Sequence, residues 1–243
     1  MAGIMRQYGG RQVWVHLPPS FESDPDLSRH LLILHDGQNL TPLRPEALGG
    51  SWLADEIVDR LSEAGEIPPL VVAGIDHAGD GRIDEFAAMA AGRPNPMMVD
   101  YADLVLEEIV PALAKEFAVR TDFDGLALGG SSMGGLATVW MAAMYPRRFG
   151  RLVVMSPSVW WGRRAILRLL RTHPIDPDTR VWVDAGVKEG ARVVRDAFTL
   201  ADRLRLQGVA NVKYVKEPKG THDEASWARR LPDALRWIYS EKA

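Results

Sequence analysis

Short runs of aliphatic and β-branched residues alternate with longer segments of helical periodicity along most of the chain. The short runs, which we expect to be strands, are residues 12–16, 31–35, 70–75, 125–128, 152–155, 181–184 and 212–215. The longer segments, which we expect to be helices, are residues 53–64, 98–117, 136–144, 165–171, 193–206 and 225–239. Alternation of this kind is typical of a mostly parallel sheet with helices on both faces.

Length and composition agree with one α/β domain. The chain has 243 residues, of which 47% are hydrophobic and 25% are charged, so it is long enough to bury a sizeable core. Because no repeat or long linker interrupts the alternation, we expect residues 1–243 to form a single domain. Residues 156–179 lie between two expected strands and leave room for a small cap at most.

Charge and cysteine content exclude several classes of function. The formal net charge of -3 gives no basic surface for nucleic acid or an anionic membrane, so neither is an expected partner. The absence of cysteine excludes disulfides, thiolate metal sites and a cysteine nucleophile. Residues 1–15 contain no continuous apolar region, and no segment has the length of a membrane span, so we expect a cytoplasmic protein. The sequence does not predict an oligomeric state.

The strongest chemical signal is the segment 130–134, GSSMG, which fits the G-x-S-x-G pattern. A glycine- and serine-rich connection of this kind also arises without function, but here an expected strand precedes it and a helical pattern follows it. That context favours a nucleophile at a tight strand-to-helix turn, where Ser132 is the central residue and the N–H of Met133 is a candidate oxyanion donor. Ser131 fits less well, because methionine stands two residues after it.

A serine hydroxyl needs a general base within hydrogen-bonding distance. His222 is our candidate, because it lies in a loop between the last expected strand and the final helix. Three other histidines are most simply structural or exposed residues, namely His16, His30 and His173.

The third member of such a site is an acid that lies between the serine and the histidine in the chain. Asp184 and Glu189 both satisfy this order, and either could orient the imidazole ring of His222. Asp184 ends an expected strand, whereas Glu189 follows Gly186 on the loop beyond it. Position therefore favours Glu189, with Asp184 as the alternative.

Two further segments are candidates for binding roles. The loop after the strand at 31–35 should supply the second oxyanion donor, for which we expect the N–H of Gln38, while His35 and Asp36 brace the loop. Trp160 and Trp161 lie in the segment where a cap would sit. They either wall an acyl or aryl pocket or pack into the core.

Metal and nucleotide sites find no support in the motifs. The segment beginning at Asp76 has part of a calcium-loop pattern, but Ala78 and Ala87 stand where oxygen ligands are required. The glycines around Ser132 lack the lysine of a phosphate-binding loop. We therefore expect no metal and no organic cofactor.

Several segments together carry a family resemblance: HDGQN, GIDH followed by RIDEF, GGSSMGG, DAGVKEG and GTHDEASW. In this order and spacing the chain resembles the enterochelin-esterase-like esterases, which are related to feruloyl esterases, S-formylglutathione hydrolases and mycolyltransferases. The resemblance extends over residues 11–239. It implies an α/β-hydrolase fold, with Ser132, His222 and Glu189 at the nucleophile, base and acid positions and Gln38 and Met133 as oxyanion donors.

These observations predict a carboxylic ester hydrolase that acts on a small-molecule ester through an acyl-enzyme on Ser132. An acyltransferase that passes the acyl group to an alcohol is the main alternative, because it would use the same residues. A noncatalytic binding protein on the same fold is the third hypothesis, because a fold alone does not determine function.

Overall fold

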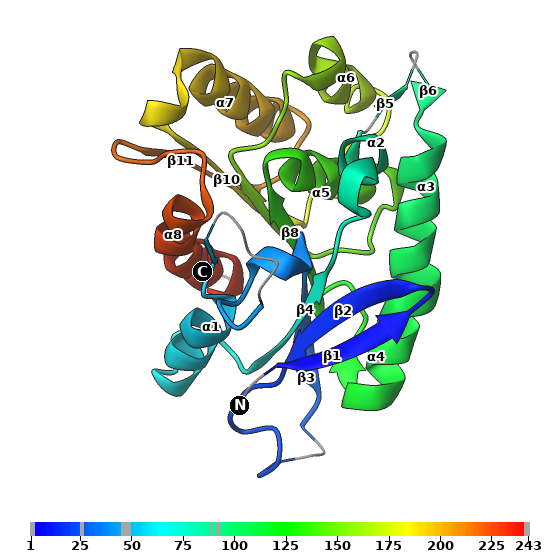
Figure 1. Cartoon of the computed structure of the whole chain (residues 1–243). Coiled ribbons are helices and arrows are strands. Elements are labelled where there is room, and N and C mark those ends of the chain that lie inside the picture. Colours follow the sequence, from blue (N-terminus) through cyan, green and yellow to red (C-terminus); the bar gives the residue numbers. More distant parts are fainter. Residues whose placement is uncertain (1–2, 25–26, 45–49, 88, 91–92, 241–243) are drawn as a thin grey trace.

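The computed structural model describes residues 3–24, 27–44, 50–87, 89–90 and 93–240 (Figure 1). Its strands are β1 (Ile4–Tyr8), β2 (Arg11–His16), β3 (Arg29–His35), β4 (Leu70–Ile75), β5 (Met89–Ala90), β6 (Arg93–Pro94), β7 (Val119–Arg120), β8 (Leu126–Ser131), β9 (Arg151–Met155), β10 (Arg180–Gly186) and β11 (Asn211–Glu217). Its α-helices are α1 (Ala54–Glu63), α2 (Arg82–Phe86), α3 (Pro96–Asp103), α4 (Val110–Phe117), α5 (Ser132–Met144), α6 (Trp161–Leu169), α7 (Ala191–Leu206) and α8 (Glu224–Tyr239). Shorter turns of helix are η1 (Gly37–Asn39), η2 (Gly79–Gly81), η3 (Leu104–Ile109) and η4 (Val187–Glu189).

One large sheet organises the described part of the chain. Its strand order is β1-β2-β4-β3-β8-β9-β10-β11, with β7 paired to β3 beside β8. Along this order, each pair of neighbours between β4 and β11 is parallel. By contrast, β1 pairs antiparallel to β2, and β2 pairs antiparallel to β4. Because the parallel strands all end at the same edge, the loops after β3, β8, β9, β10 and β11 converge there.

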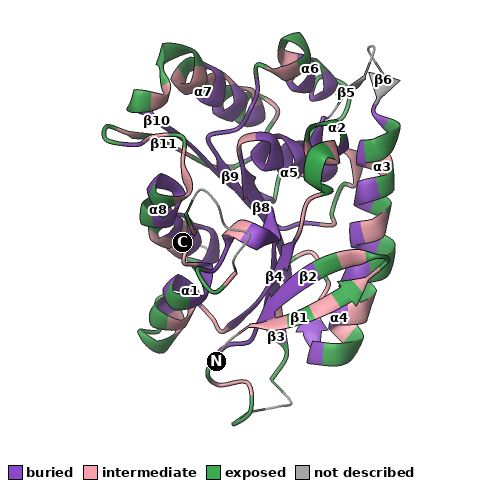
Figure 2. Cartoon of the chain, in the orientation of Figure 1, coloured by how far each residue is buried: buried purple, intermediate pink, exposed green. Residues whose placement is uncertain are grey.

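Alternation along the strands creates two hydrophobic layers. On β3, Leu31 and Ile33 pack into a core that also holds buried residues of α3, α4, α5, α6 and α7. Leu32 and Leu34 face the other way and pack with α1 and α8. Figure 2 shows the central strands buried, while the helices keep exposed sides. Helices therefore cover both faces, and the predicted α/β-hydrolase fold is confirmed.

Most expected elements occur within a few residues of their predicted bounds, but two expected helices differ, and the sequence did not predict β1, β5, β6, β7 or α2. The helix expected at 98–117 contains a π-helical segment, η3, which separates α3 from α4. The helix expected at 136–144 begins four residues earlier, at Ser132, because the glycines of the motif are themselves helical. Strand β1 was not predicted, because its half-buried residues IMRQY show little hydrophobic contrast. It forms the edge of the sheet by pairing with β2.

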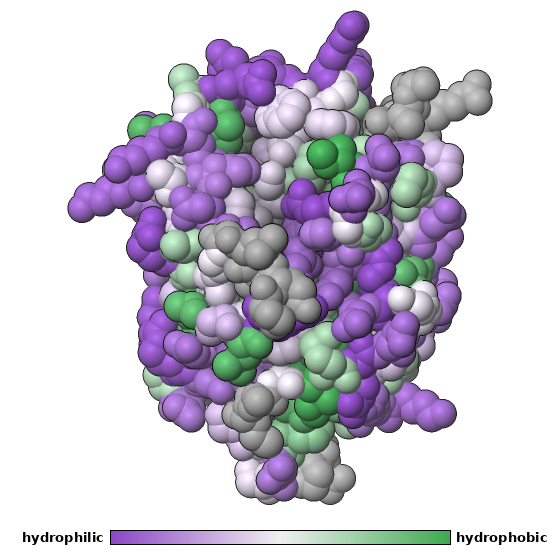
Figure 3. Space-filling view, in the orientation of Figure 1, coloured by the Kyte–Doolittle hydropathy of each residue, from purple (hydrophilic) through white to green (hydrophobic). Residues whose placement is uncertain are grey.

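The segment expected to form a small cap carries α6, which packs onto the main core through Ile166 and Leu169. None of the described helices is both long enough and apolar enough to span a bilayer. Hydrophilic side chains cover most of the face shown in Figure 3, and hydrophobic ones appear there in small separate groups.

Candidate active site

Ser132 occupies a sharp turn at the carboxyl end of β8. Its φ of 55° lies in the left-handed region, which is unfavourable for a residue with a Cβ. The glycines on either side explain why the turn is possible. A Cβ on Gly130 would approach the backbone of Gly134 to 2.9 Å, and one on Gly134 would approach the Cβ of His35 to 3.1 Å. The G-x-S-x-G spacing therefore allows β8 and α5 to pack closely against the end of β3.

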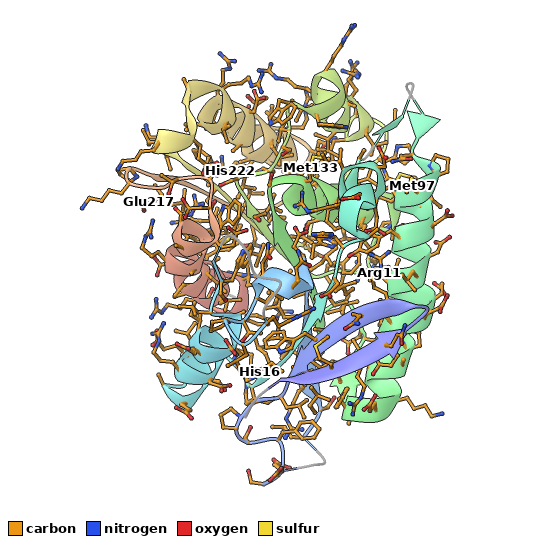
Figure 4. All side chains as sticks on the ribbon, in the orientation of Figure 1. Arg11, His16, Met97, Met133, Glu217 and His222 are labelled. Atoms are coloured by element: carbon orange, nitrogen blue, oxygen red, sulfur yellow. The ribbon has the colours of Figure 1, made fainter. Side chains whose placement is uncertain are left out.

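Three polar side chains from separate parts of the chain form a continuous series of hydrogen bonds. Ser132 Oγ lies 3.0 Å from His222 Nε2, and His222 Nδ1 lies 2.6 Å from Glu189 Oε2. His222 comes from the loop between β11 and α8, and Glu189 ends η4, directly after β10. In Figure 4, His222 and Met133 lie near the same end of the sheet, whereas His16 lies near the other end. The structure thus brings together the serine, the histidine and the favoured acid.

Ser156, in the loop after β9, fixes the orientation of Glu189. Its Oγ accepts hydrogen bonds from Trp227 Nε1 and from Arg230 Nη2, both at 3.1 Å. Indole and guanidinium nitrogens can only donate, so both lone pairs of this hydroxyl are engaged. Its single hydrogen is then donated to Glu189 Oε1, at 2.6 Å.

The hydrogen bonds at Glu189 also determine which nitrogen of His222 carries its hydrogen. Glu189 Oε1 also accepts the N–H of Gly186 at 2.7 Å, which leaves Oε2 for His222. Burial raises the pKa of the Glu189 carboxyl, but hydrogen bonds from His222, Ser156 and Gly186 outweigh burial and hold that pKa below its ordinary value. An ionised carboxylate only accepts, so Nδ1 of His222 carries the hydrogen. Nε2 then presents its lone pair to Ser132 Oγ, as a general base requires.

Asp184, the alternative acid, has a different set of partners. It is fully buried, and it accepts the N–H of Ser156 at 3.2 Å and Trp182 Nε1 at 2.8 Å. Burial raises the pKa of Asp184 to about 6, against the opposing attraction of Arg230, whose Nη1 lies 3.1 Å from Oδ1. Arg230 is itself 3.7 Å from Glu189 Oε1. Asp184 is therefore a partner of Arg230 and Ser156, and these two residues in turn contact Glu189.

The loop after β3 lies close to the same site. Asp36 has a φ of 58° and forms a two-point ion pair with Arg82, at 2.6 and 2.8 Å. A Cβ on Gly37 would collide with the backbone of Gly74, so glycine lets this loop turn tightly against β4. Gln38 is the middle residue of η1 and is buried.

The two candidate oxyanion donors both stand at the start of a helical turn. Met133 is the second residue of α5, so its N–H precedes the first intrahelical bond and is available for a ligand. Gln38 holds the corresponding position in η1. The partial positive charge at the beginning of α5 also favours a developing negative charge near Ser132.

The two tryptophans that were predicted as a pair differ in their surroundings. Trp160 is 37% exposed and carries the guanidinium of Arg192 over its ring, 5.0 Å from the centroid. Trp161 packs partly buried against the main core and meets Trp160 edge to face at 5.5 Å. The main-chain N–H of Trp161 donates to the carbonyl oxygen of Ser158. The hydroxyl of Ser158 in turn lies 3.3 Å from that of Ser132. Trp160 is therefore the more exposed of the two rings, and Arg192 covers one of its faces.

The histidines predicted as structural or exposed have other partners. His16 Nε2 lies 2.7 Å from Asp59 Oδ1, His30 meets the ring of Tyr239 edge to face, and His173 Nδ1 lies 2.9 Å from the hydroxyl of Thr172. His35 Nδ1 lies 2.7 Å from the hydroxyl of Tyr101, and His35 is buried beside Gly130 and Gly134, on either side of Ser132.

Within the described ranges, no group of three histidine or carboxylate side chains could hold a metal ion. Asp76, the first residue of the partial calcium-loop pattern, is instead paired with Arg44 through both carboxylate oxygens. A cavity of about 550 Å³ lies between α7 and β11, lined by residues such as Val187, Phe198 and Tyr214. None of its lining residues belongs to the hydrogen-bond chain.

Sequence reasoning did not identify Ser156, Ser158 or Arg230. The two serines had a usable signal, since they directly follow a parallel strand at the edge where Ser132 and His222 were expected. Arg230 had none, because only the packing of α8 against the sheet brings it beneath Glu189.

The parallel sheet, with Ser132, His222 and Glu189 at the carboxyl ends of its strands, defines the class as an α/β-hydrolase fold. Residues 8–238 match the family described as "Putative esterase", and the chain belongs to that family.

Relatives and a solved structure are similar to this chain over nearly its whole length. The chain is 26% identical over 242 residues to the iron(III) enterobactin esterase of Dickeya dadantii, with 94% of this chain and 51% of that protein covered. It is 21% identical over 260 residues to YbbA of Bacillus subtilis, with 99% and 98% covered. The structure of an IroE-like serine hydrolase from Shewanella oneidensis superposes with a TM-score of 0.79 at 15% identity, with 98% and 80% covered. The chain thus spans about half the length of the enterobactin esterase that it matches.

Proposed function

We propose that this protein hydrolyses carboxylic esters through a covalent acyl-enzyme on Ser132. The observation that carries the proposal is the series of hydrogen bonds from Ser132 Oγ through His222 to Glu189. Because the donors around Glu189 require the hydrogen of His222 on Nδ1, Nε2 is left as an acceptor facing the serine. Membership of an esterase family supports the same reaction class.

In the first half of the reaction, Ser132 Oγ attacks the ester carbonyl carbon while His222 Nε2 takes its proton. The carbonyl π electrons move to oxygen, and the N–H groups of Met133 and Gln38 stabilise this oxyanion. Collapse of the intermediate expels the alcohol, which takes the proton from His222. Water then repeats the sequence on the acyl-enzyme and releases the carboxylic acid.

Glu189 acts through His222 by holding Nδ1 protonated and by stabilising the imidazolium as it forms. Its own orientation depends on Ser156 and Gly186. Asp184 takes no part in proton transfer, and its carboxylate offsets the buried charge of Arg230.

The substrate is a small-molecule ester, and we propose that Trp160 walls the part of the pocket that receives an acyl or aryl group. Trp161 packs edge to face against that ring. The relatives include iron(III) enterobactin and salmochelin esterases, and these names support cleavage of an ester.

Turnover of short p-nitrophenyl esters, with and without EDTA, tests this proposal. We expect p-nitrophenol release that EDTA does not affect and that Ser132→Ala abolishes. Strict metal dependence, or no turnover of any ester, would contradict it. Product analysis with and without an added alcohol determines whether water or an alcohol accepts the acyl group, which separates a hydrolase from an acyltransferase.

A further inference from the structure

A second hydroxyl lies beside the nucleophile. Ser158 Oγ is 3.3 Å from Ser132 Oγ, and the Ser158 side chain is buried, with 3% of the residue exposed. The main chain of Ser158 also contacts the elbow, because its N–H donates to the carbonyl oxygen of Ser132 at 2.9 Å. Ser158 is thus fixed to the nucleophile by its backbone and touches the reacting atom with its side chain.

The direction of the side-chain contact follows from counting hydrogens. Ser132 has one hydroxyl hydrogen, which points to Nε2 of His222 when the site is ready to react. The contact between the two serine hydroxyls then requires the hydrogen of Ser158. Within the part of the chain that the structure describes, the Ser158 hydroxyl has no other hydrogen-bond partner.

We infer that Ser158 is a further catalytic residue, which donates a hydrogen bond to Ser132 Oγ as that oxygen attacks the ester. The inference rests on the proposed function, because it assigns a role at the same nucleophile. Ser158 transfers no proton in this step. The proton of Ser132 goes to His222, the Oγ–carbon bond forms, and the carbonyl π pair moves to the oxyanion.

The resting distance explains how such a contact accelerates the reaction. Hydroxyl pairs usually lie about 2.7–2.8 Å apart, so a separation of 3.3 Å is a weak bond in the resting enzyme. While His222 removes the proton and before the bond to carbon is complete, Ser132 Oγ carries partial negative charge, and hydrogen bonds to charged oxygens are shorter and stronger than those to neutral ones. An interaction that strengthens on the way to the transition state lowers the barrier, whereas one of constant strength does not. The same donor stabilises Oγ when it departs from the acyl-enzyme during deacylation.

A purely structural role for Ser158 makes a different prediction. The main-chain bond to Ser132 anchors the loop, and this bond survives in Ser158→Ala. Removal of the side chain alone should therefore leave the fold unchanged and affect only the chemistry at Oγ.

The experiment compares Ser158→Ala with the matched control Ser131→Ala, which removes a neighbouring buried hydroxyl at the end of β8. Three quantities are measured: kcat and KM on p-nitrophenyl acetate, the rate of labelling by a fluorophosphonate, and thermal unfolding. For Ser158→Ala we expect kcat/KM and the labelling rate to fall together by about 10- to 100-fold, the loss for a hydrogen bond to a charged group. KM should change less than twofold, and the unfolding temperature should stay that of the wild type. Ser158→Cys, which keeps the shape but is a weaker donor, should lose less than Ser158→Ala.

The outcomes separate this inference from the proposed function. Wild-type rates in Ser158→Ala, or an equal loss in Ser131→Ala, would overturn the role of Ser158 and leave the esterase proposal intact. A wild-type protein that neither hydrolyses esters nor reacts with the fluorophosphonate would overturn the proposed function itself.

Discussion

Glutamine at position 189 should reverse the tautomer of His222. The carboxamide has one oxygen, and two donors meet at the Oε1 position, namely the hydroxyl of Ser156 and the N–H of Gly186. The oxygen therefore stays there, and the NH₂ group takes the Oε2 position, next to Nδ1 of His222. This NH₂ group can only donate, so Nδ1 must lose its hydrogen and Nε2 must gain one. Nε2 then cannot accept the proton of Ser132.

The cost of restoring the active tautomer sets the size of the effect. Turning the amide around would place its NH₂ group against the two donors at Oε1 and leave both without an acceptor. Each unsatisfied buried group costs about 1–3 kcal/mol, so the active arrangement lies about 4 kcal/mol higher. Since each 1.36 kcal/mol is a factor of ten, Glu189→Gln should lower kcat/KM by about a thousandfold.

The assay is kcat/KM on p-nitrophenyl acetate, measured beside Asp184→Asn after thermal unfolding has established that both variants fold. Asp184 does not contact His222, and its oxygens meet Trp182, the N–H of Ser156 and Arg230. We therefore expect Asp184→Asn to lower stability more than turnover. Near-normal turnover in Glu189→Gln with a severe loss in Asp184→Asn would refute this reasoning and move the acid role to Asp184.

Three further predictions concern parts of the site around this chain. Burial lowers the pKa of His35 to about 4 from an ordinary 6.5. The unfolded chain therefore binds the extra proton as the pH falls from 6.5 to 4, and about 3 kcal/mol of stability is lost over that range. Urea unfolding at pH 7 and at pH 4.5 should show that His35→Gln loses less stability between these two pH values than the wild type does. Equal losses in the two proteins would contradict this origin. Gly130→Ala should cost about 1–3 kcal/mol of stability and slow fluorophosphonate labelling, because its Cβ would press on Gly134; unchanged unfolding and labelling would show that the elbow tolerates a side chain. Trp160→Ala should raise KM for p-nitrophenyl benzoate by about 2- to 10-fold and leave KM for the acetate unchanged; an equal change for both esters would argue against an aryl-binding role.

The sequence was sufficient for the general fold and for which loops meet. Strands such as β4 are continuous apolar runs, as buried parallel strands require, so their positions could be predicted closely. Ser132 and His222 could be selected because the motif and the chain order restrict the choice to one residue each. Strand β1 could not be predicted, because pairing with β2 at the edge of the sheet determines it more than its own pattern does.

Sequence order alone did not decide between the two acids, because it allowed both Asp184 and Glu189. Position on the loop and the family resemblance favoured Glu189, and the distance to His222 gives the same preference. Asp184 shares a face of β10 with Trp182, two residues earlier, and strand alternation directs both toward the layer that contains α8. Ser156 and Arg230 meet Glu189 through the packing of α8 and the β9 loop, which local pattern does not encode.

The most direct test of the central claim is to find the residue that forms the covalent intermediate. The protein is treated with a fluorophosphonate, digested and mapped by mass spectrometry, beside Ser132→Ala. This control keeps the Cβ at the strained turn and should fold like the wild type. We predict one adduct per chain, on Ser132, and none in Ser132→Ala. An adduct on Ser131 or another residue, or no adduct on a folded wild-type protein, would contradict an acyl-enzyme on Ser132.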